Sequence, residues 1–362
     1  MRSEKRKTAW RTVLGAALSF LCMAAVCSRD GTQAADLAHL RELPAVQTAS
    51  AGRMVVPLGR AVGIKLFSDG VLVVGMSELE TGQGMVSPGK ACGLKTGDVI
   101  THVNGKEVDT IEEVQDILKE EGKQPLTLRA SRGGKVVQLS AQAVANRGGQ
   151  YQLGVWLRDS MAGIGTLTFY DPASGQFGAL GHGINDIDTA KLMPLESGTI
   201  MYASVSDVKK GAPGVPGELH GTFDVSQDLG TLHINTELGV YGTLTQTDAF
   251  PTGTLMKTAR RDEIFEGPAT ILSNVAGEEV REYAIEITQI YPAAAGAGRN
   301  FMVRVTDPEL LNQTGGIVQG MSGSPVIQNG KLVGAVTHVL VNDPTRGYGI
   351  FIENMLEASE NS

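Results

Sequence analysis

The string GGIVQGMSGSP at residues 315–325 is the most specific pattern in the chain, and its end reads G-x-S-G-S-P from Gly320 to Pro325. Because glycine has no Cβ, the backbone at Gly320 can turn sharply and point its N–H outward. The N–H of Ser322 can point the same way, and the two would then form an oxyanion hole for charge that develops in acyl transfer. The alternative is a Gly/Ser turn between two strands, which is common.

The same string resembles the nucleophile loop of chymotrypsin-like serine peptidases. In such a loop Ser322 attacks, whereas Ser324 packs beneath it, because the neighbouring Pro325 has no N–H to offer an oxyanion. The resemblance implies an enzyme with Ser322 as the nucleophile and the N–H groups of Gly320 and Ser322 as the oxyanion hole.

The chain has 362 residues, 46 glycines and a formal net charge of −8. This length suits two domains, and the many glycines suit short strands joined by turns. Basic residues are scattered beyond the N-terminus, which argues against a nucleic-acid-binding surface. The cysteines Cys22, Cys27 and Cys92 form neither a disulfide framework nor a zinc-binding spacing, so neither a metal nor a cofactor is expected.

Basic residues at positions 2, 5, 6, 7 and 11 precede an apolar run at residues 13–27. Positive charge before a run of this length is typical of a secretory signal or signal anchor. We expect residues 1–28 to be a signal anchor, uncleaved or cleaved late, that enters the membrane through residues 13–27. Residues 29–52 would be a polar tether, and the rest of the chain would lie outside the cytoplasm.

Residues 53–146 have the pattern of a compact α+β unit. SPGKACGLKTGDVI at residues 87–100 is followed by VNGK at residues 103–106, in which Asn-Gly favours a tight hairpin turn. Apolar residues at helical spacing predict an amphipathic helix over residues 110–121. Together these features resemble a PDZ domain of the bacterial type.

A PDZ domain binds an extended peptide by adding it to an open sheet edge. The resemblance implies a carboxylate-binding loop at Ala61, Val62, Gly63 and Ile64, with a groove between residues 64–66 and the predicted helix. The ligand would be a peptide or protein, and the chain's own N-terminal region is one candidate.

Residues 147–362 carry short strand-like segments between Gly-rich connections. Apolar and polar residues alternate at residues 282–287 and 301–305, as they do on strands with one buried face. The expected fold of the whole chain is therefore mainly β: a membrane anchor, the PDZ domain and a chymotrypsin-like or related all-β serine peptidase domain.

A serine hydroxyl needs a base to take its proton. His182 follows a strand-like segment, and its small neighbours would let the ring reach across a cleft. His338 lies on the strand after the nucleophile loop. It is the second candidate for the base, or it would line a specificity pocket with Thr337, Gly347 and Gly349.

The third member of a catalytic triad would be a carboxylate that orients the imidazole. The candidates are Asp186, Asp188, Asp248 and Asp307. Asp307 ends an alternating strand directly before Pro308, although an Asp before Pro is also a common turn cap.

Several strings resemble the stage IV sporulation protein B peptidase family: GHG at residues 181–183, VRVTD at 303–307, the GGIVQGMSGSP string and AVTHVLVNDPT at 335–345. With the anchor and the single PDZ domain, the resemblance covers nearly the whole chain. By motif it implies His182 as the base, Asp307 as the acid and Ser322 as the nucleophile. Asp307 precedes Ser322 by only fifteen residues, whereas the acid of chymotrypsin-like chains lies much farther upstream.

The family resemblance also implies a biological role. These peptidases are exported across the forespore membrane into the intermembrane space, where they cut themselves and then a membrane-bound inhibitor of an intramembrane metalloprotease. That cleavage leads to pro-sigma K processing. The alternatives are a general envelope-quality-control serine protease and a non-catalytic PDZ scaffold with an inactive β domain. The high-temperature-requirement proteases of the first alternative place their PDZ domain after the protease, whereas here it comes first.

Overall fold

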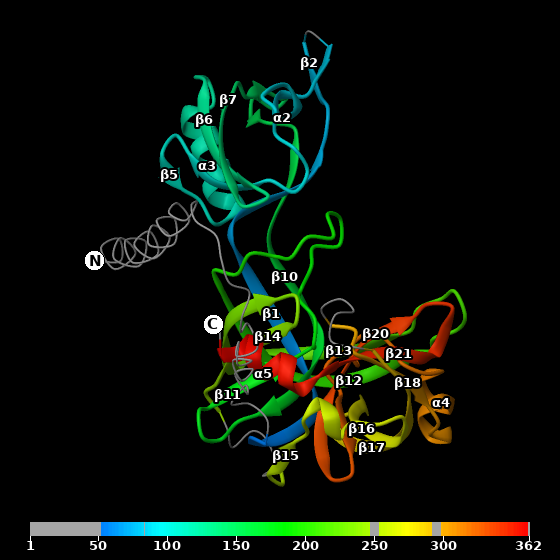
Figure 1. Cartoon of the computed structure of the whole chain (residues 1–362). Helices are drawn as coiled ribbons and strands as arrows, with labels where there is room; N and C mark the ends of the chain where they lie inside the picture. Colours follow the sequence, from blue (N-terminus) through cyan, green and yellow to red (C-terminus); the bar gives the residue numbers. More distant parts are fainter. Residues whose placement is uncertain (1–51, 83, 247–252, 292–297, 361–362) are drawn as a thin grey trace, which may run out of the picture. The chain divides into compact units, whose positions relative to one another are not determined.

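The computed structural model describes residues 52–360, apart from residues 83, 247–252 and 292–297 (Figure 1). The predicted anchor at residues 1–28 and almost all of the tether lie outside these residues. Within the described ranges, no helix combines the length and the apolar character that crossing a membrane requires. The expectation of a mainly β chain is confirmed, since strands dominate both barrels described below.

Antiparallel strands close into a ring that we call the first barrel. Its order is β1 (Met54–Met76), β10 (Val155–Tyr170), β11 (Gln176–Ala179), β14 (Gly239–Leu244), β13 (Glu218–Thr236) and β12 (Ser197–Lys209), which returns to β1. Alternate residues point inward, so that Val62, Leu167, Phe177 and Ile200 form part of its buried core.

A second ring of strands forms the second barrel. Its order is β16 (Gly267–Ala276), β17 (Glu279–Ile290), β18 (Phe301–Val305), β21 (Asp343–Phe351), β20 (Lys331–Leu340) and β19 (Pro325–Gln328), which returns to β16. Ile285, Phe301 and Val336 lie in its core. The strand β15 (Met256–Thr258) pairs with β20 and with the start of β1, and thereby joins the barrels.

Short helices complete the second barrel. These are η2 (Arg261–Glu263), α4 (Pro308–Thr314), which connects β18 to the nucleophile loop, and the C-terminal helix α5 (Ile352–Glu360). The apolar side of α5 buries Met355 and Leu356 against residues of β11, β14, β20 and β21.

The PDZ elements are inserted between two strands of the first barrel. After Phe67, β1 continues to Met76 and pairs with β4 and with the first part of β10. The intervening elements are β2 (Leu79–Thr81), β3 (Gly84–Val86), α2 (Pro88–Ala91), β4 (Val99–Val103), β5 (Lys106–Glu107), α3 (Ile111–Glu121), β6 (Leu126–Arg132), β7 (Lys135–Ala141), β8 (Val144–Ala145) and β9 (Tyr151–Gln152). The boundaries thus differ from the expected 53–146 and 147–362: residues 56–67 pair within the first barrel, and residues 155–158 pair with the PDZ part of β1.

The predicted helix at residues 110–121 corresponds to α3. The Thr110 hydroxyl accepts a hydrogen bond from the N–H of Glu113, and the Glu113 carboxylate accepts one from the N–H of Thr110, which makes a capping box. Val114, Ile117 and Leu118 are buried in the PDZ core, as the apolar spacing predicts.

The predicted carboxylate-binding loop at Ala61, Val62, Gly63 and Ile64 is wrong. These residues lie inside β1, where β10 pairs with one edge at all four positions and β12 pairs with the other edge from Val62 onward. Their backbone therefore has no open edge for a peptide. A Cβ on Gly63 would lie 2.6 Å from the Phe223 ring, so this glycine serves barrel packing.

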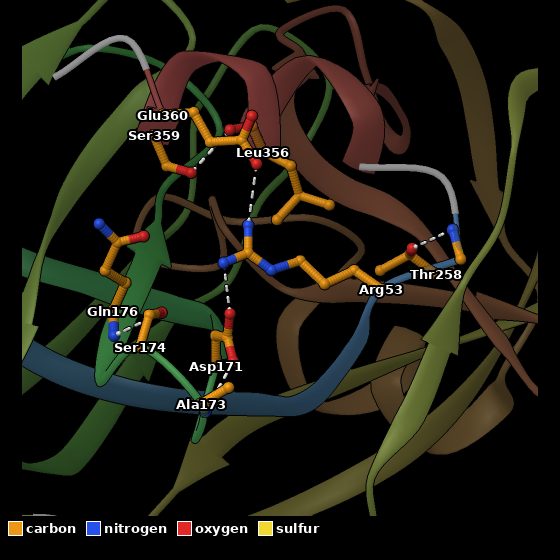
Figure 2. Close-up of polar contacts among 10 residues, drawn as sticks. Arg53, Asp171, Ala173, Ser174, Gln176, Thr258, Leu356, Ser359 and Glu360 are labelled. Carbon is orange, nitrogen blue, oxygen red and sulfur yellow. Dashed lines mark hydrogen bonds and ion pairs between the residues drawn. The ribbon is translucent and has the colours of Figure 1, made fainter. Parts of the chain in front are cut away.

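Ion pairs join Arg53, directly before β1, to the turn between β10 and β11 and to the C-terminal helix α5 (Figure 2). The guanidinium of Arg53 lies 2.5 Å from the Asp171 carboxylate, at the turn from β10 to β11, and 3.1 Å from Glu360 of α5. The N–H of Gly52 donates to the hydroxyl of Thr258 in β15 (3.2 Å). The Asp171 side chain is only 3% exposed, so its charge depends on Arg53 for compensation.

We expect Arg53→Ala to lower the free energy of unfolding by about 2–3 kcal/mol, because it leaves the buried Asp171 carboxylate unpaired. Arg147→Ala is the matched control, since Arg147 and its partner Glu80 are both exposed, and its loss should be under about 1 kcal/mol. Urea unfolding measures both changes. Equal losses in the two variants would contradict the structural role of Arg53.

Candidate active site

The nucleophile loop connects α4 to β19 and places Ser322 beside β20. The Ser322 hydroxyl donates to the backbone carbonyl of Thr337 (2.6 Å). The N–H of Gly323 donates to the carbonyl of Val336 (2.7 Å), which fixes the loop against the same strand. A Cβ on Gly323 would lie 2.1 Å from the Thr166 carbonyl, so only glycine fits there.

The two predicted oxyanion-hole donors are available in this loop. Neither Gly320 nor Ser322 donates its N–H to an acceptor within the described part of the chain. Gly320 has a φ of +98°, which favours glycine. Two free N–H groups in a tight turn beside a serine hydroxyl are what stabilisation of a tetrahedral oxyanion requires.

Ser324 has the structural role that the sequence predicts for it. Its side chain is fully buried, and its hydroxyl donates to that of Ser273 on β16 (3.1 Å). Ser322, in contrast, is half-buried. The loop therefore leaves Ser322 accessible and buries Ser324.

His182 lies in a strained turn that follows β11. Leu180 and Gly181 both have a φ of +67°, and for a leucine this left-handed conformation is costly. A Cβ on Gly181 would lie 2.9 Å from side-chain atoms of Thr337 and Ile350, so the turn packs closely against β20 and β21. Because of this packing, His182 lies beside β20, the strand whose Thr337 carbonyl binds the Ser322 hydroxyl.

The two candidate histidines lie next to each other. The ring centroids of His182 and His338 are 5.1 Å apart, with an interplanar angle of 41°. Nδ1 of His182 lies 2.8 Å from the carbonyl of Gly183. Donation from Nδ1 to this carbonyl leaves Nε2 as the atom that can accept a proton. Nδ1 of His338 is buried and has no hydrogen-bond partner among the described residues.

Both imidazoles are held in the neutral form. Burial lowers the pKa of His182, against a smaller opposing effect of the Gly183 carbonyl. Burial lowers the pKa of His338 to about 4, and the charges of His182 and Arg299 add to this effect. A neutral imidazole is the form in which histidine acts as a general base.

The contacts of Asp307 correct the expectation that it orients His182. One carboxylate oxygen of Asp307 accepts hydrogen bonds from the N–H groups of Glu309 and Leu310, and thereby caps α4. The other accepts from the N–H of Ala284 on β17 (3.2 Å). The carboxylate makes no hydrogen bond to either histidine, both of which the structure describes. Asp307 therefore has the role of a turn cap, which was the alternative to a catalytic role.

Asp186 and Asp188 make no hydrogen bond or ion pair to His182 either, and Arg158 pairs with both. Asp186 is fully buried and pairs with Arg158, and it accepts hydrogen bonds from the N–H groups of Asp188 and Thr189. Burial alone would raise the pKa of Asp186, but the bonds from Thr189 and Arg158 lower it. Asp186 thus holds the loop after His182 in place. Asp248 lies outside the described residues.

Asn235 on β13 is a supporting residue that the sequence did not indicate. Its side-chain oxygen accepts from the N–H of Ile184 (2.8 Å), and its amide nitrogen donates to the carbonyls of Ile184 and Met193. These bonds anchor the segment that follows His182. An Asn on an alternating strand gives no sign of such a role before the barrel closes.

The predicted specificity-pocket residues are mostly used for packing. The Thr337 side chain is buried, with its hydroxyl within hydrogen-bond distance of the carbonyls of Gly298 and Tyr348. A Cβ on Gly347 would meet Ile317 at 2.7 Å, and one on Gly349 would meet the Phe301 ring at 2.2 Å. The space beside Gly347 and Gly349 is therefore already filled by other side chains, so the expectation that these two glycines line a specificity pocket is wrong. His338 alone among the four is half-exposed beside Ser322.

The open edge of the PDZ sheet lies on β10. Residues 155–158 pair with residues 72–76 of β1, and no described strand pairs with their other edge. The N–H of Ser77 donates to the carbonyl of Gly154 (2.9 Å). The alternation of an antiparallel ladder then turns the N–H and C=O of Val155 toward the unpaired edge.

Helix α3 flanks this edge along its length. The N–H of Ile111 at its start donates to the Asp159 carboxylate (2.9 Å), and Gly122 at its end packs against Tyr151. The N–H groups of Leu153 and Gly154 donate to no acceptor among the residues that the structure describes. The edge at residues 153–158, which α3 borders, is therefore the place where a PDZ domain would add a peptide strand.

Family models match these two parts of the chain. The family model SpoIVB peptidase S55 matches residues 149–356, and a PDZ domain model matches residues 85–132. No curated protein matches the chain. The PDZ domain of an SdrC-like protein from Listeria monocytogenes is 22% identical and covers 25% of this chain and 87% of its own, with a TM-score of 0.20.

Structures of the Rv3671c protease from Mycobacterium tuberculosis also match. The inactive mutant form is 15% identical and covers 56% of this chain and 83% of its own, with a TM-score of 0.30. The active form is 14% identical and covers 56% and 74%, with a TM-score of 0.31. Since the peptidase model spans more than half of the sequence, the chain belongs to the SpoIVB peptidase S55 family and is a serine peptidase with a PDZ domain.

Proposed function

We propose that this chain is an exported, membrane-anchored serine endopeptidase that cuts itself and then a membrane-bound regulatory protein in a sporulation pathway that leads to pro-sigma K processing. Family membership supports the pathway, and the basic and apolar N-terminus supports export. Anchored by residues 13–27 or released by cleavage, the enzyme would act in the intermembrane space of the sporangium.

The observation that carries the catalytic part is that Ser322 and the turn that holds His182 both pack against residues 337 and 338 of β20. Ser322 comes from the second barrel and bonds to Thr337 of β20, whereas Gly181, directly before His182, packs against the Thr337 side chain from the first barrel. The His182 ring lies 5.1 Å from that of His338, the next residue of the same strand. Residues from two barrels converge there beside two free backbone N–H groups. A merely structural turn would not need this arrangement.

The residues have the following roles in the proposed reaction. The Ser322 hydroxyl rotates away from the Thr337 carbonyl and gives its proton to Nε2 of His182 as it attacks the scissile carbonyl. The N–H groups of Gly320 and Ser322 hold the resulting oxyanion. The Gly183 carbonyl, at Nδ1, takes the orienting place that a carboxylate has in the usual triad. His182 then protonates the leaving amine.

The PDZ groove binds an extended segment of a protein substrate, including the chain's own N-terminal region. Val155 offers backbone groups for strand addition, and Leu153 and Gly154 offer free N–H groups for a carboxylate. The ligand class is therefore a peptide, preferably one with a free C-terminus.

We expect Gly154→Val to weaken cleavage of a protein substrate about tenfold or more, because strand addition contributes much of the binding free energy. Gly154 has a φ of +67°, and a Cβ there would lie 2.7 Å from the Ser77 carbonyl, so the substitution distorts the loop. Hydrolysis of a small ester should stay within about twofold, since the ester does not need the groove. Gly149→Val is the control: its φ is +78°, but no atom lies within 4 Å. Equal loss of both activities would contradict a binding role.

Mass spectrometry of the purified full-length chain over time tests the proposed function directly. Fragments that arise from cleavage near the N-terminus, and that are absent from a Ser322→Ala sample, are the expected result. A chain that stays intact, and that also leaves candidate membrane-bound partners uncut, would contradict it.

A further inference from the structure

We propose that Thr166 is a positioning residue for catalysis, because its hydroxyl locks the peptide plane between the two oxyanion-hole donors. This inference rests on the proposed catalytic role of the Ser322 loop. Thr166 lies on β10 in the first barrel and is 1% exposed. Its hydroxyl donates to the carbonyl of Gly320 in the second barrel (2.7 Å).

The orientation of an oxyanion donor is set by its own peptide plane, in which the N–H points opposite to the preceding carbonyl. The carbonyl of Gln319 accepts from the N–H of Leu219 (2.9 Å), which fixes the plane that contains the Gly320 N–H. The carbonyl of Met321 accepts from the N–H of Ser324 (3.0 Å), which fixes the plane that contains the Ser322 N–H.

The plane between these two is that of Gly320 and Met321. Its N–H donates to the Val318 carbonyl (3.1 Å), and its carbonyl accepts from Thr166. Gly320 has a φ of +98° and no side chain to limit rotation, so this plane is free to turn unless a partner holds it. The Thr166 hydroxyl is the side-chain partner that holds it, and thereby keeps both donors aimed at one point.

The backbone of Thr166 also connects the nucleophile loop to the turn that holds the base, His182. Its N–H donates to the Ser322 carbonyl (3.2 Å), and its carbonyl accepts from the N–H of Leu180 (3.2 Å), two residues before His182. One residue thus joins the nucleophile loop to the turn that carries the base. These backbone bonds persist in any Thr166 variant, so a side-chain substitution isolates the hydroxyl.

The neighbouring Thr168 provides a matched control on the same strand. It lies two residues along β10, is 0% exposed, and its hydroxyl has no hydrogen-bond partner in the described structure. Threonine and valine are both β-branched, so Thr→Val removes the hydroxyl at either site with little change in side-chain shape. Only the Thr166 hydroxyl has a bond to lose.

The experiment measures kcat and KM for a small ester with the full-length chain in detergent, for wild type, Thr166→Val, Thr166→Ser and Thr168→Val. We expect Thr166→Val to lower kcat by about 10–100-fold, because a small misplacement of catalytic groups has effects of this size. KM should change less than about threefold and the pH profile should keep its shape, since His182 is untouched. Thr166→Ser should restore most of kcat, and Thr168→Val should match wild type.

Thermal unfolding and the endpoint of fluorophosphonate labelling correct each rate for the folded, active fraction. A wild-type kcat in Thr166→Val, or an equal loss in Thr166→Ser, would overturn the proposal. A loss in Thr166→Val that disappears after this correction would also overturn it, because the hydroxyl would then serve folding alone. Ser322→Ala in the same assay distinguishes failure of the Thr166 proposal from failure of the proposed function. Activity that survives in Ser322→Ala would reject the proposed catalytic role of Ser322 itself.

Discussion

Replacing Ser322 by alanine is expected to abolish turnover of both ester and protein substrates, with a loss on the order of a million-fold, as for other serine peptidases that lose their nucleophile. The structure supports this result because Ser322 is the half-exposed serine of its loop, beside two free N–H groups. Folding should be unaffected, since the only side-chain hydrogen bond lost is the one to the Thr337 carbonyl. Steady-state kinetics and circular dichroism measure the two effects.

Ser324→Ala is the matched control for this prediction. Its hydroxyl meets only that of Ser273, in the core of the second barrel. We expect a modest loss of stability, about 1 kcal/mol for one buried hydrogen bond, and activity within about tenfold of wild type. An inactive Ser324→Ala beside an active Ser322→Ala would mean that the roles of the two serines are reversed.

Replacing His182 by alanine is expected to lower kcat by about 10⁴–10⁶-fold, because the variant lacks the imidazole that takes the Ser322 proton in the proposed reaction. His338→Ala should keep activity within about tenfold of wild type and mainly alter substrate choice, since that ring borders the site. The same ester assay, with binding constants for two peptide substrates, separates the two results. The opposite ranking of the two variants would make His338 the base.

The pH dependence follows from the direction of the histidine shifts. General base catalysis needs the neutral imidazole, so activity rises as the pH passes upward through the pKa of the base. Burial lowers the pKa of His182, so the rise should fall below the ordinary value near 6.5. Because His338 is coupled to His182, the profile reports the apparent pKa values of the pair. A rise centred above pH 7 would contradict a buried, neutral base.

The nucleophile loop could be predicted from the sequence because its chemistry is local. Gly320, Gly323 and the two serines need only their immediate backbone geometry to define their roles. The helix α3 was likewise predictable, since the capping box and the apolar spacing lie within its own residues. His182 could be ranked first because small residues flank it in a turn.

The position of the PDZ groove could not be predicted from the sequence. An apolar residue, a glycine and an apolar residue follow one another both at 62–64 and at 153–155. Which of these segments borders α3 depends on where the long strand β1 leaves the barrel. That choice depends on pairing with β10 and β12, which lie about a hundred or more residues away in the sequence.

The orienting partner of the base was also beyond sequence reasoning. Asp307 has the right residue type at a strand end, but its barrel position directs its carboxylate to the N-terminus of α4 and to Ala284. The Gly183 carbonyl that contacts His182 is a backbone group, and a sequence gives no sign of it. The role of Thr166 is hidden for a similar reason, because it depends on the contact between two barrels.

Covalent labelling tests the central claim, that Ser322 is an activated nucleophile, most directly. The full-length chain would be treated with a fluorophosphonate and digested, and the modified peptide identified by mass spectrometry. We predict one adduct, on Ser322, that forms more slowly in His182→Ala and is absent from Ser322→Ala. An adduct on another serine, or no adduct on the folded wild-type chain, would contradict the account.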